Sequence, residues 1–224
     1  MGNLRRAPTG DKPAPKAVVG RVSLYLRQLE TFRRQGLATV SSHQLGTALA
    51  IHDAQVRKDL AFFGQFGHPG VGYRIADLAD ALRRILGIDH DWPLALVGLG
   101  NLGRALLKYQ GFRDRGFQII ALFDNDPQKV GQTLEGMTVR PVDALADLVR
   151  EQRLNLAVLS VPADFAQQVA DQLVASGIVG IFNFAPIPLI VPNHVRVVAV
   201  DLSIQLEHLA YQIQLGGGGI SCAS

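Results

Sequence analysis

The sequence lacks the features that mark secreted and membrane proteins. Cysteine occurs once, at Cys222 in a Gly- and Ser-rich tail, so the chain cannot form a disulfide with itself. No apolar run approaches the roughly 20 residues that span a bilayer. Residues 1–17 carry basic side chains but no apolar segment of the kind found in signal peptides. We therefore expect a cytoplasmic protein.

The chain has little net charge, but its positive and negative residues are unevenly distributed along the sequence. The net charge is +3, yet residues 1–92 carry 13 Lys and Arg against 8 Asp and Glu, whereas residues 93–224 carry 9 against 11. Hydrophobic residues make up 48% of the chain, which is enough for a core. The basic first part indicates a polyanionic partner such as nucleic acid, with ordinary surface charge as the alternative.

The first part of the chain is predicted to be a helical domain preceded by a tail. Residues 1–16 are rich in Pro, Gly and basic residues without periodicity, which predicts a disordered basic tail. The domain is expected to cover 17–90. Apolar residues recur at spacings of three and four from 17 to 35, and Gly36 is expected to end that helix. The same periodicity predicts a helix over 74–87.

Between the helices predicted over 17–35 and 74–87, the sequence predicts two short helices that are typical of a helix-turn-helix. Ser41, with Gln44 three residues on, forms a capping-box pattern that predicts a helix over 42–50. Asp53 is expected to cap a second helix over 54–63, and a tight turn joins the two. The residues expected to face inward from the first of these helices are Leu45, Ala48 and Leu49.

The second short helix carries side chains suited to a recognition helix. Gln55 and Arg57 are of the types that hydrogen-bond base edges, and Lys58 suits phosphate. They lie near the helix N-terminus, the part that enters the major groove. A solvated helix surface bearing Arg and Lys is the alternative. Asp59 is assigned to the polar side of this helix, and Val56, Leu60 and Phe63 to its buried side.

A glycine-rich stretch, 64–73, follows that helix. Val71 and Tyr73 alternate with glycines, which predicts a small β-hairpin, the wing of a winged helix. The order of helix, helix-turn-helix and wing is more specific than any one part, so we predict a winged-helix DNA-binding domain. Its further candidate DNA-binding residues are Ser42, His68, Gly70 and Tyr73.

The rest of the chain alternates strands and helices. This order predicts an α/β fold with a Rossmann-like parallel sheet over 91–202, which begins where a polar stretch ends in Pro93. Expected strands cover 93–97, 118–123, 137–140, 154–161, 177–184 and 195–200. Expected helices cover a segment ending near Tyr109, then 142–151 and 163–176.

A glycine turn joins the first of these strands to the first helix. Gly98-Leu99-Gly100-Asn101-Leu102-Gly103 fits the GxGxxG pattern of dinucleotide-binding folds. Gly98 would allow the sharp turn, Gly100 the approach of a pyrophosphate, and Gly103 close packing of the helix on the strand. Asn101 and Leu102 are assigned to the same cofactor site.

The second strand ends in Asp124, 21 residues after Gly103. A dinucleotide fold places there the acid that hydrogen-bonds the adenine ribose, and a carboxylate repels a 2′-phosphate. The sequence therefore favours NAD+ and NADH over the NADP forms, with a helix-capping aspartate as the alternative. Asn125 and Asp126 extend this site. Because ligands lie at the carboxyl ends of parallel strands, the nicotinamide is expected near Ser160, Val161, Pro162, Asn183, Ala185 and Pro186.

The end of the chain is predicted to be a helix over 203–215, capped by Ser203. Its apolar residues need a surface to cover them, either on their own domain or on a partner subunit. They are Leu206, Leu209, Ala210 and Ile213. A flexible tail is predicted for 216–224.

An enzyme that moves a hydride to or from such a cofactor needs a general acid or base beside the nicotinamide. The histidines of the second part are His194, in a loop, and His208, and no His–Asp or Lys–Asp spacing stands out. We therefore expect no catalytic residue and no metal site. An NAD-dependent oxidoreductase with an accessory N-terminal domain is the alternative, and a structural or nucleotide-binding module ranks third.

The combination of a winged helix and a dinucleotide fold resembles the Rex family of redox-sensing transcriptional repressors, over about 17–215. The most specific part is Gln55-Val56-Arg57-Lys58-Asp59-Leu60 followed by Gly70-Val71-Gly72-Tyr73. The other matching segments are Tyr25-Leu26-Arg27, Ser42-His43-Gln44-Leu45-Gly46, Val97–Gly103, Phe123–Pro127 and Asn183-Phe184-Ala185-Pro186.

The resemblance implies a homodimer whose terminal helices are exchanged between subunits. It implies that the protein binds palindromic operator DNA when NAD+ prevails and releases it when NADH rises. Arg27, Tyr109 and Asp201 match family residues that form a polar contact in one state of the protein.

The resemblance also bears on the contacts with DNA. Arg57 and Lys58 match the DNA-contacting positions of the family. His68-Pro69 departs from the basic wing that is common in the family. Because phosphate contacts mainly set affinity, we expect altered affinity rather than lost specificity.

Overall fold

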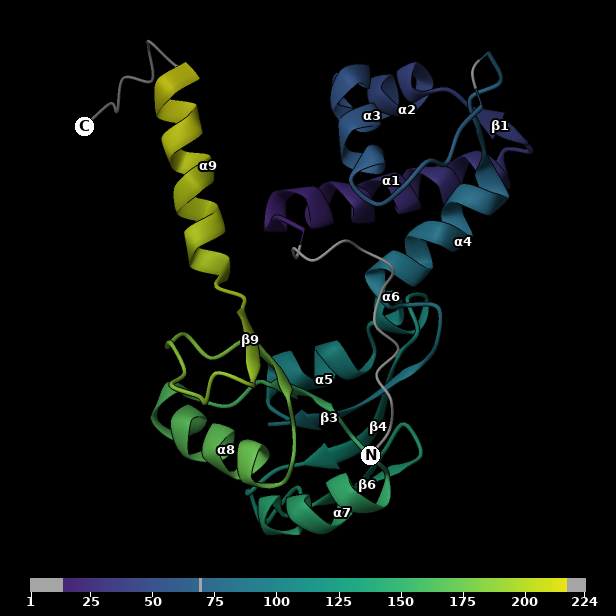
Figure 1. Ribbon diagram of the computed structural model, residues 1–224. Coiled ribbons are helices and arrows are strands. Elements are labelled where there is room, and N and C mark those ends of the chain that lie inside the picture. Colours follow the sequence, from purple (N-terminus) through teal and green to yellow (C-terminus); the bar gives the residue numbers. More distant parts are fainter. Residues whose placement is uncertain (1–13, 69, 217–224) are drawn as a thin grey trace. The chain divides into compact units, whose positions relative to one another are not determined.

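The computed structural model describes residues 14–68 and 70–216, which fall into two compact units divided between Asp91 and Trp92 (Figure 1). The tails predicted for 1–16 and 216–224 lie outside the described residues, apart from 14–16 and Gly216. Lys16 already begins a helix and Gly216 still belongs to one. Both helices therefore extend into the segments that were predicted as tails.

The first unit is built from four helices and a two-stranded sheet. Its elements are α1 (Lys16–Arg34), β1 (Thr39–Val40), α2 (Ser42–Leu49), α3 (Asp53–Ala61), β2 (Tyr73–Arg74) and α4 (Ile75–Leu86). α1 packs against the other three helices, and its buried face carries Tyr25 and Leu29. α1 ends where Gly36 adopts a φ of +83°, a conformation that glycine allows without strain.

The capping box predicted for α2 is present. Ser41 Oγ accepts a hydrogen bond from Gln44 N at 3.1 Å, and Gln44 Oε1 accepts one from Ser41 N at 2.8 Å. The prediction that Ala48 faces inward is wrong, because that residue is exposed. Gly46 is buried instead, and a Cβ there would collide with Ile51 O. The tight approach of α2 to the following turn therefore depends on this glycine.

The wing is not a hairpin of two strands from the same stretch, because its base pairs with β1, which lies earlier in the chain. His68 and Gly72 exchange two backbone hydrogen bonds, of 3.0 and 3.1 Å, around the wing tip, where Pro69 lies outside the described residues. The base of the wing is formed by β2, which pairs with β1 in antiparallel register. β1 has only two residues, too few to give an alternating signal in the sequence.

The second unit is a seven-stranded sheet that is parallel except at β5. Its strands are β3 (Trp92–Val97), β4 (Phe117–Phe123), β5 (Thr133–Leu134), β6 (Met137–Arg140), β7 (Leu156–Leu159), β8 (Gly180–Asn183) and β9 (Arg196–Ala199). They lie in the order β5-β6-β4-β3-β7-β8-β9. The order reverses at β3, which is where open parallel sheets bind ligands. All six predicted strands are present, several with shorter ends, and only β5 was not predicted.

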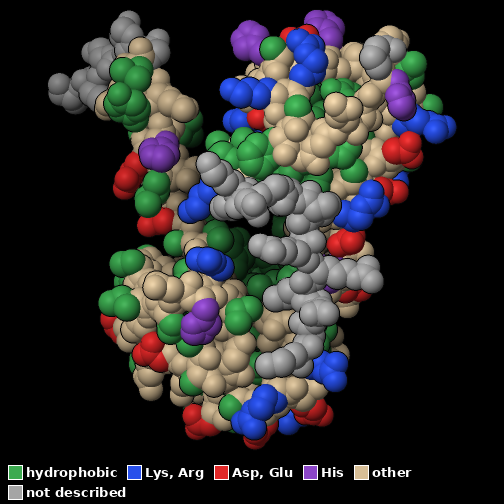
Figure 2. Space-filling model, in the orientation of Figure 1, with side chains coloured by type: hydrophobic (Ala, Val, Ile, Leu, Met, Phe, Trp, Pro, Cys, Tyr) green, Lys and Arg blue, Asp and Glu red, His purple; other side chains and the backbone are tan. Residues whose placement is uncertain are grey.

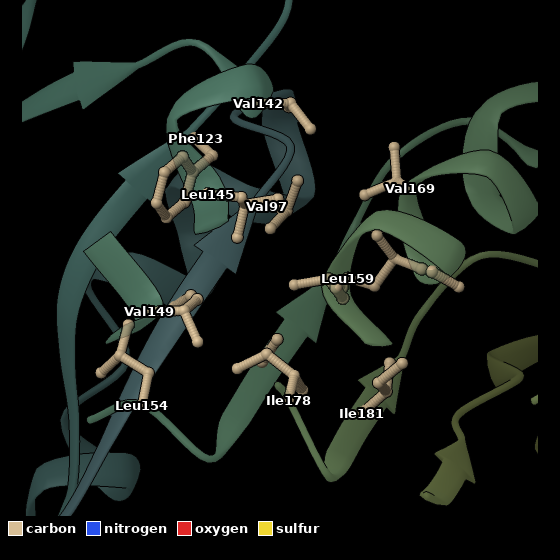
Figure 3. Close-up of a cluster of buried hydrophobic side chains, with 14 of the residues drawn as sticks. Val97, Phe123, Val142, Leu145, Val149, Leu154, Leu159, Val169, Ile178 and Ile181 are labelled. Carbon is tan, nitrogen blue, oxygen red and sulfur yellow. The ribbon is translucent and has the colours of Figure 1, made fainter. Parts of the chain in front are cut away.

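Helices cover both faces of this sheet. They are α5 (Asn101–Leu107), α6 (Gln110–Arg113), a 3₁₀ turn η1 (Val142–Ala144), α7 (Leu145–Glu151) and α8 (Ala163–Ala175). α7 and α8 bury one face in a cluster that includes Val97, Leu145 and Leu159 (Figure 3). Leu106 and Leu107 of α5 pack on the opposite face. The helix expected to run to about Tyr109 ends two residues earlier, at Leu107, and α6, which follows Tyr109, was not predicted.

The chain ends its described part in a solitary helix, α9 (Leu202–Gly216), one residue longer at each end than the predicted 203–215. Its cap is Asp201 rather than the predicted Ser203, because Asp201 Oδ1 accepts from Ser203 N at 2.9 Å. Every side chain from 202 to 215 is exposed. Figure 1 shows α9 leaving the edge strand β9 and pointing away from the sheet.

Candidate functional site

A cavity of about 570 Å³ lies at the carboxyl ends of β3, β4 and β7. The loops that follow these three strands supply most of its lining. Eight of the twelve residues predicted to bind a cofactor line it, namely Gly98, Gly100, Asn101, Leu102, Asp124, Asn125, Asp126 and Pro162. The structure thus gathers the glycine turn and the end of β4 around one space.

The three glycines of the turn are needed for different reasons. Gly98 has a φ of +93°, and a Cβ there would lie 2.5 Å from Ser160 O. Gly103 lies under the turn, where a Cβ would collide with Gly98 O, so Gly103 supports the cavity without lining it. A Cβ at Gly100 would meet open space. That open approach is what a pyrophosphate would need.

Two side chains hold the turn in place. Ser160 Oγ, at the end of β7, donates to Gly98 O at 2.8 Å. Asp124 Oδ2, at the end of β4, accepts from Leu99 N at 2.7 Å. The turn after the central strand is therefore tied to both neighbouring strands, which fixes its backbone before any ligand arrives.

Asp124 is a buried carboxylate with several partners. Its Oδ1 accepts from Asp126 N at 2.9 Å, and Lys129 Nζ lies 3.2 Å from Oδ2. Burial raises the pKa of Asp124, but these hydrogen bonds and the one from Leu99 N outweigh burial and hold the pKa below its usual range. The residue is therefore charged at neutral pH, as its predicted role in binding ribose requires.

The structure does not bring the residues predicted at the end of β8 to this cavity. Asn183 is fully buried, and its Nδ2 donates to Ala185 O at 3.2 Å and Ile187 O at 2.9 Å. Its Oδ1 accepts from Ala185 N at 2.9 Å. Asn183 therefore shapes the loop that carries Ala185 and Pro186, and none of the three lines the cavity.

Several lining residues were not among the predicted site residues. Lys129 forms ion pairs with Asp124 and Asp126, at 3.2 and 3.4 Å. Its signal in the sequence is its place five residues after Asp124 in the same loop. The apolar lining residues Val142, Phe165 and Val169 come from η1 and α8, and nothing in their local sequence marks them as site residues.

A second cavity, of about 670 Å³, lies between α3 and the wing. Five of the seven predicted DNA-binding residues line it, namely Ser42, Arg57, His68, Gly70 and Tyr73. Arg57 Nη1 donates to Asp53 Oδ2 at 2.7 Å and to Ser42 Oγ at 3.1 Å. The hydrogen bond from Arg57 holds the pKa of Asp53 below its usual range. Figure 2 shows Lys, Arg and His side chains gathered on the surface over α2 and α3.

Gln55 and Lys58, the other two predicted residues, lie outside this cavity. Lys58 is exposed, whereas Gln55 is partly buried against Asp59. The assignment of Asp59 to the polar side of the helix is wrong, because its side chain is buried with 2% exposure. Asp59 is buried because Arg21 and Tyr25 of α1 bond to it, at 2.6 and 2.7 Å.

The residues predicted to form a polar contact in one state lie in both units. Arg27 is exposed on α1, and Asp201 caps α9. Tyr109 lies between α5 and α6, more than half exposed, with its ring edge-to-face on Phe112 at 5.2 Å. Each is accessible to a partner, and their mutual contact stays a prediction.

Within residues 14–68 and 70–216, no group of three His, Cys, Asp or Glu side chains could hold a metal ion. None of the helices in that part of the chain is long and apolar enough to cross a membrane.

Comparison with family models matches two segments of the chain. Residues 14–61 match a putative DNA-binding protein N-terminus, and residues 89–187 match a CoA-binding domain. The first segment contains α1, α2 and α3, and the second contains the glycine turn and Asp124.

Curated relatives match over almost their whole length. A redox-sensing transcriptional repressor Rex from Desulfitobacterium hafniense is 46% identical over 199 residues, which cover 89% of this chain and 95% of that protein. The protein of the same name from Streptomyces griseus is 42% identical over 222 residues, covering 99% of this chain and 88% of that one.

Solved structures of a Rex-family repressor called RSP are similar over both units. RSP in complex with β-NAD+ and operator DNA is 33% identical with a TM-score of 0.87, covering 92% of this chain and 95% of that one. RSP in complex with β-NADH is 32% identical with a TM-score of 0.82, covering 92% of this chain and 97% of that one.

Proposed function

The chain belongs to the Rex family of redox-sensing transcriptional repressors, and we propose that it binds operator DNA and releases it when NADH occupies the cavity beside β3. One observation carries the proposal: a single chain holds a helix-turn-helix with Arg57 and Lys58 and a glycine turn tied to Asp124. The RSP structures, with NAD+ and operator DNA and with NADH, support the same pair of ligands.

The cavity suits a nicotinamide dinucleotide. Gly100 leaves open space for a pyrophosphate, and the loop after β4 supplies carboxylates for an adenine ribose. On the other side, Val161, Pro162 and Phe165 supply an apolar wall for the nicotinamide. The cofactor contributes its redox state, and the residues of this chain bind and orient it.

The redox state can be sensed through the charge of the ring. The nicotinamide of NAD+ is positive and that of NADH is neutral, and burial against apolar residues such as Val161 and Phe165 favours the neutral form. A ligand shifts a conformational equilibrium only as far as its affinities for the two states differ. The apolar wall supplies such a difference.

DNA recognition is assigned to α3 and the wing. Arg57, at the middle of α3, and Lys58, in its last turn, are both exposed, as side chains that contact DNA must be. Ser42 and the wing residues His68, Gly70 and Tyr73 share the cavity beside Arg57, where a phosphate backbone can approach. A palindromic operator would engage two copies of this surface.

The second copy is proposed to dock through α9. Seven large apolar side chains of this helix are exposed by 43–71%. An exposed apolar surface of this kind marks an interaction site. We assign its cover to the sheet unit of a second copy, which gives a homodimer with exchanged helices acting in the cytoplasm. The names of the two curated relatives, both repressors, disfavour the oxidoreductase alternative.

The test is a mobility-shift assay with a palindromic duplex selected from random sequence by the chain itself in the presence of NAD+. We expect a shifted band with NAD+ that disappears when NADH is added. A band that persists at saturating NADH would overturn the sensing role. Steady oxidation of NADH by small carbonyl compounds would revive the oxidoreductase alternative.

A further inference from the structure

The loop after β4 presents two carboxylates, Asp124 and Asp126, that differ in how many of their hydrogen-bond acceptor positions are occupied. Both oxygens of Asp124 are already bonded, Oδ2 to Leu99 N and Lys129 Nζ and Oδ1 to Asp126 N. A carboxylate offers about four acceptor positions, so one is left on Asp124. Its side chain is also only 11% exposed. Asp124 is therefore mainly committed to the shape of the turn.

Asp126 has more unoccupied acceptor positions than Asp124, and its side chain is more exposed. Its side chain is 39% exposed and lines the cavity. One oxygen, Oδ1, accepts from Gln128 N at 2.9 Å, and the other lies 3.4 Å from Lys129 Nζ. Each oxygen of Asp126 thus keeps room for a hydroxyl donor at the rim of the cavity.

Lys129 lies between these two carboxylates. Its ammonium group pairs with Asp124 and Asp126 and is 26% exposed. Two carboxylates and one ammonium leave a net charge of −1 at this rim. A 2′-phosphate placed there would meet that charge at short range, whereas a ribose hydroxyl would find an acceptor.

From these contacts we infer that Asp126, rather than Asp124, is the residue that selects a ribose bearing a free 2′-hydroxyl over one bearing a 2′-phosphate. Asp124 and Lys129 act as positioning residues. Asp124 fixes the backbone at Leu99 and Asp126, and Lys129 holds the two carboxylates and limits their repulsion. The inference rests on the proposed binding of NADH in this cavity.

The test compares the dissociation constants of NADH and NADPH, followed by nucleotide fluorescence. For the full wild-type chain we expect a strong preference for NADH. Asp126→Asn should shrink the ratio of the two constants by about tenfold or more, mainly by tightening NADPH. Asp147→Asn, the same charge change on an exposed α7 residue outside the cavity, should leave the ratio unchanged.

Two further variants separate selection from positioning. Asp124→Asn should weaken both nucleotides and shrink their ratio by less than Asp126→Asn does, because Asp124 is the more buried of the two carboxylates. Lys129→Met should enlarge the ratio, because removing the ammonium leaves the full negative charge facing a 2′-phosphate. A structural role alone would weaken both nucleotides equally.

The outcomes are distinct. If Asp126→Asn leaves the ratio unchanged while Asp124→Asn abolishes it, the inference is overturned and the proposed function survives. If the wild-type chain binds neither nucleotide, the proposed function itself fails, and the inference fails with it.

Discussion

Gln55 Nε2 donates a 2.7 Å hydrogen bond to Asp59 Oδ1, one turn further along α3. The same oxygen accepts from Arg21 Nη2 at 2.8 Å. A side chain whose type suggests base reading is thus tied to a buried carboxylate, while Arg57 and Lys58 stay exposed. The contact divides α3 into an anchored side and an exposed side.

This division predicts different effects for the two exposed residues. Arg57→Ala should weaken operator binding by about 1–3 kcal/mol and relax discrimination against changed operator sequences. Lys58→Ala should weaken operator and unrelated DNA alike and lower the salt slope of binding by about one. Fluorescence anisotropy at several salt concentrations measures both. Equal loss of discrimination in the two variants would contradict the assignment of Arg57 to bases.

The anchored side predicts a pH-dependent contribution to stability. Burial raises the pKa of Asp59, but hydrogen bonds from Arg21, Tyr25 and Gln55 outweigh it and hold the pKa below its ordinary value of 3.8. Because the folded-state pKa is lower than the unfolded one, the carboxylate stabilises the fold above pH 3.8. That contribution is lost as the pH falls through the folded-state pKa.

Asp59→Asn should therefore lower the free energy of unfolding by roughly 3 kcal/mol at neutral pH. This is near the lower end for breaking a buried pair, since Arg21 keeps contact with water. Urea unfolding followed by circular dichroism should show the difference from wild type narrowing below pH 3.8. Asp77→Asn, on an exposed carboxylate of α4, is the control and should change stability by less than about 0.5 kcal/mol. A difference that is constant with pH would refute the account.

The glycine turn predicts a variant that binds DNA but no longer senses NADH. Gly98→Ala places a methyl group 2.5 Å from Ser160 O, and we expect at least about a tenfold loss of NADH affinity with operator binding retained. Gly131→Ala is the matched control, because Gly131 has a similar φ of +87° but open space around it. If both variants lose NADH equally, backbone strain rather than the close approach is the cause.

The exposed helix predicts the oligomeric state. Replacing Leu206 and Ile213 of α9 together by Asp should convert a dimer to a monomer in sedimentation experiments and abolish binding to a palindromic duplex. The control replaces Gln205 and Gln212 by Asp, which adds the same charge at the same spacing on polar positions. A chain that is monomeric before any substitution would contradict the proposed docking of α9.

Local signals explain how much of the fold could be predicted from the sequence. The capping box at Ser41 and the glycine turn at Gly98 depend on residues within a few positions of each other, and both appear as expected. The alternation of strands and helices likewise predicted the sheet. β1 and β5, with two residues each, are too short to leave a periodic signal.

Hydrogen-bond partners that only the folded chain reveals explain what could not be predicted. The local sequence predicts that Asp59 lies on the surface. In the structure it is buried because Arg21 and Tyr25 of α1, 38 and 34 positions earlier in the chain, bond to it. Asn183 ends a strand, as a ligand-binding residue would, yet its amide bonds only to the loop that follows. The role of Asp59 is decided by hydrogen bonds from a distant helix, and that of Asn183 by hydrogen bonds within its own loop, which the residue type alone does not reveal.

The most direct test of the central claim measures the coupling between the two ligands. Thermodynamic linkage requires that operator DNA weaken NADH affinity by the same factor by which NADH weakens operator affinity. Titrating NADH into the wild-type chain, with and without the selected palindromic duplex, measures this factor by nucleotide fluorescence. We predict at least about a tenfold weaker NADH affinity in the presence of DNA. Equal NADH affinity with and without bound DNA would contradict the account.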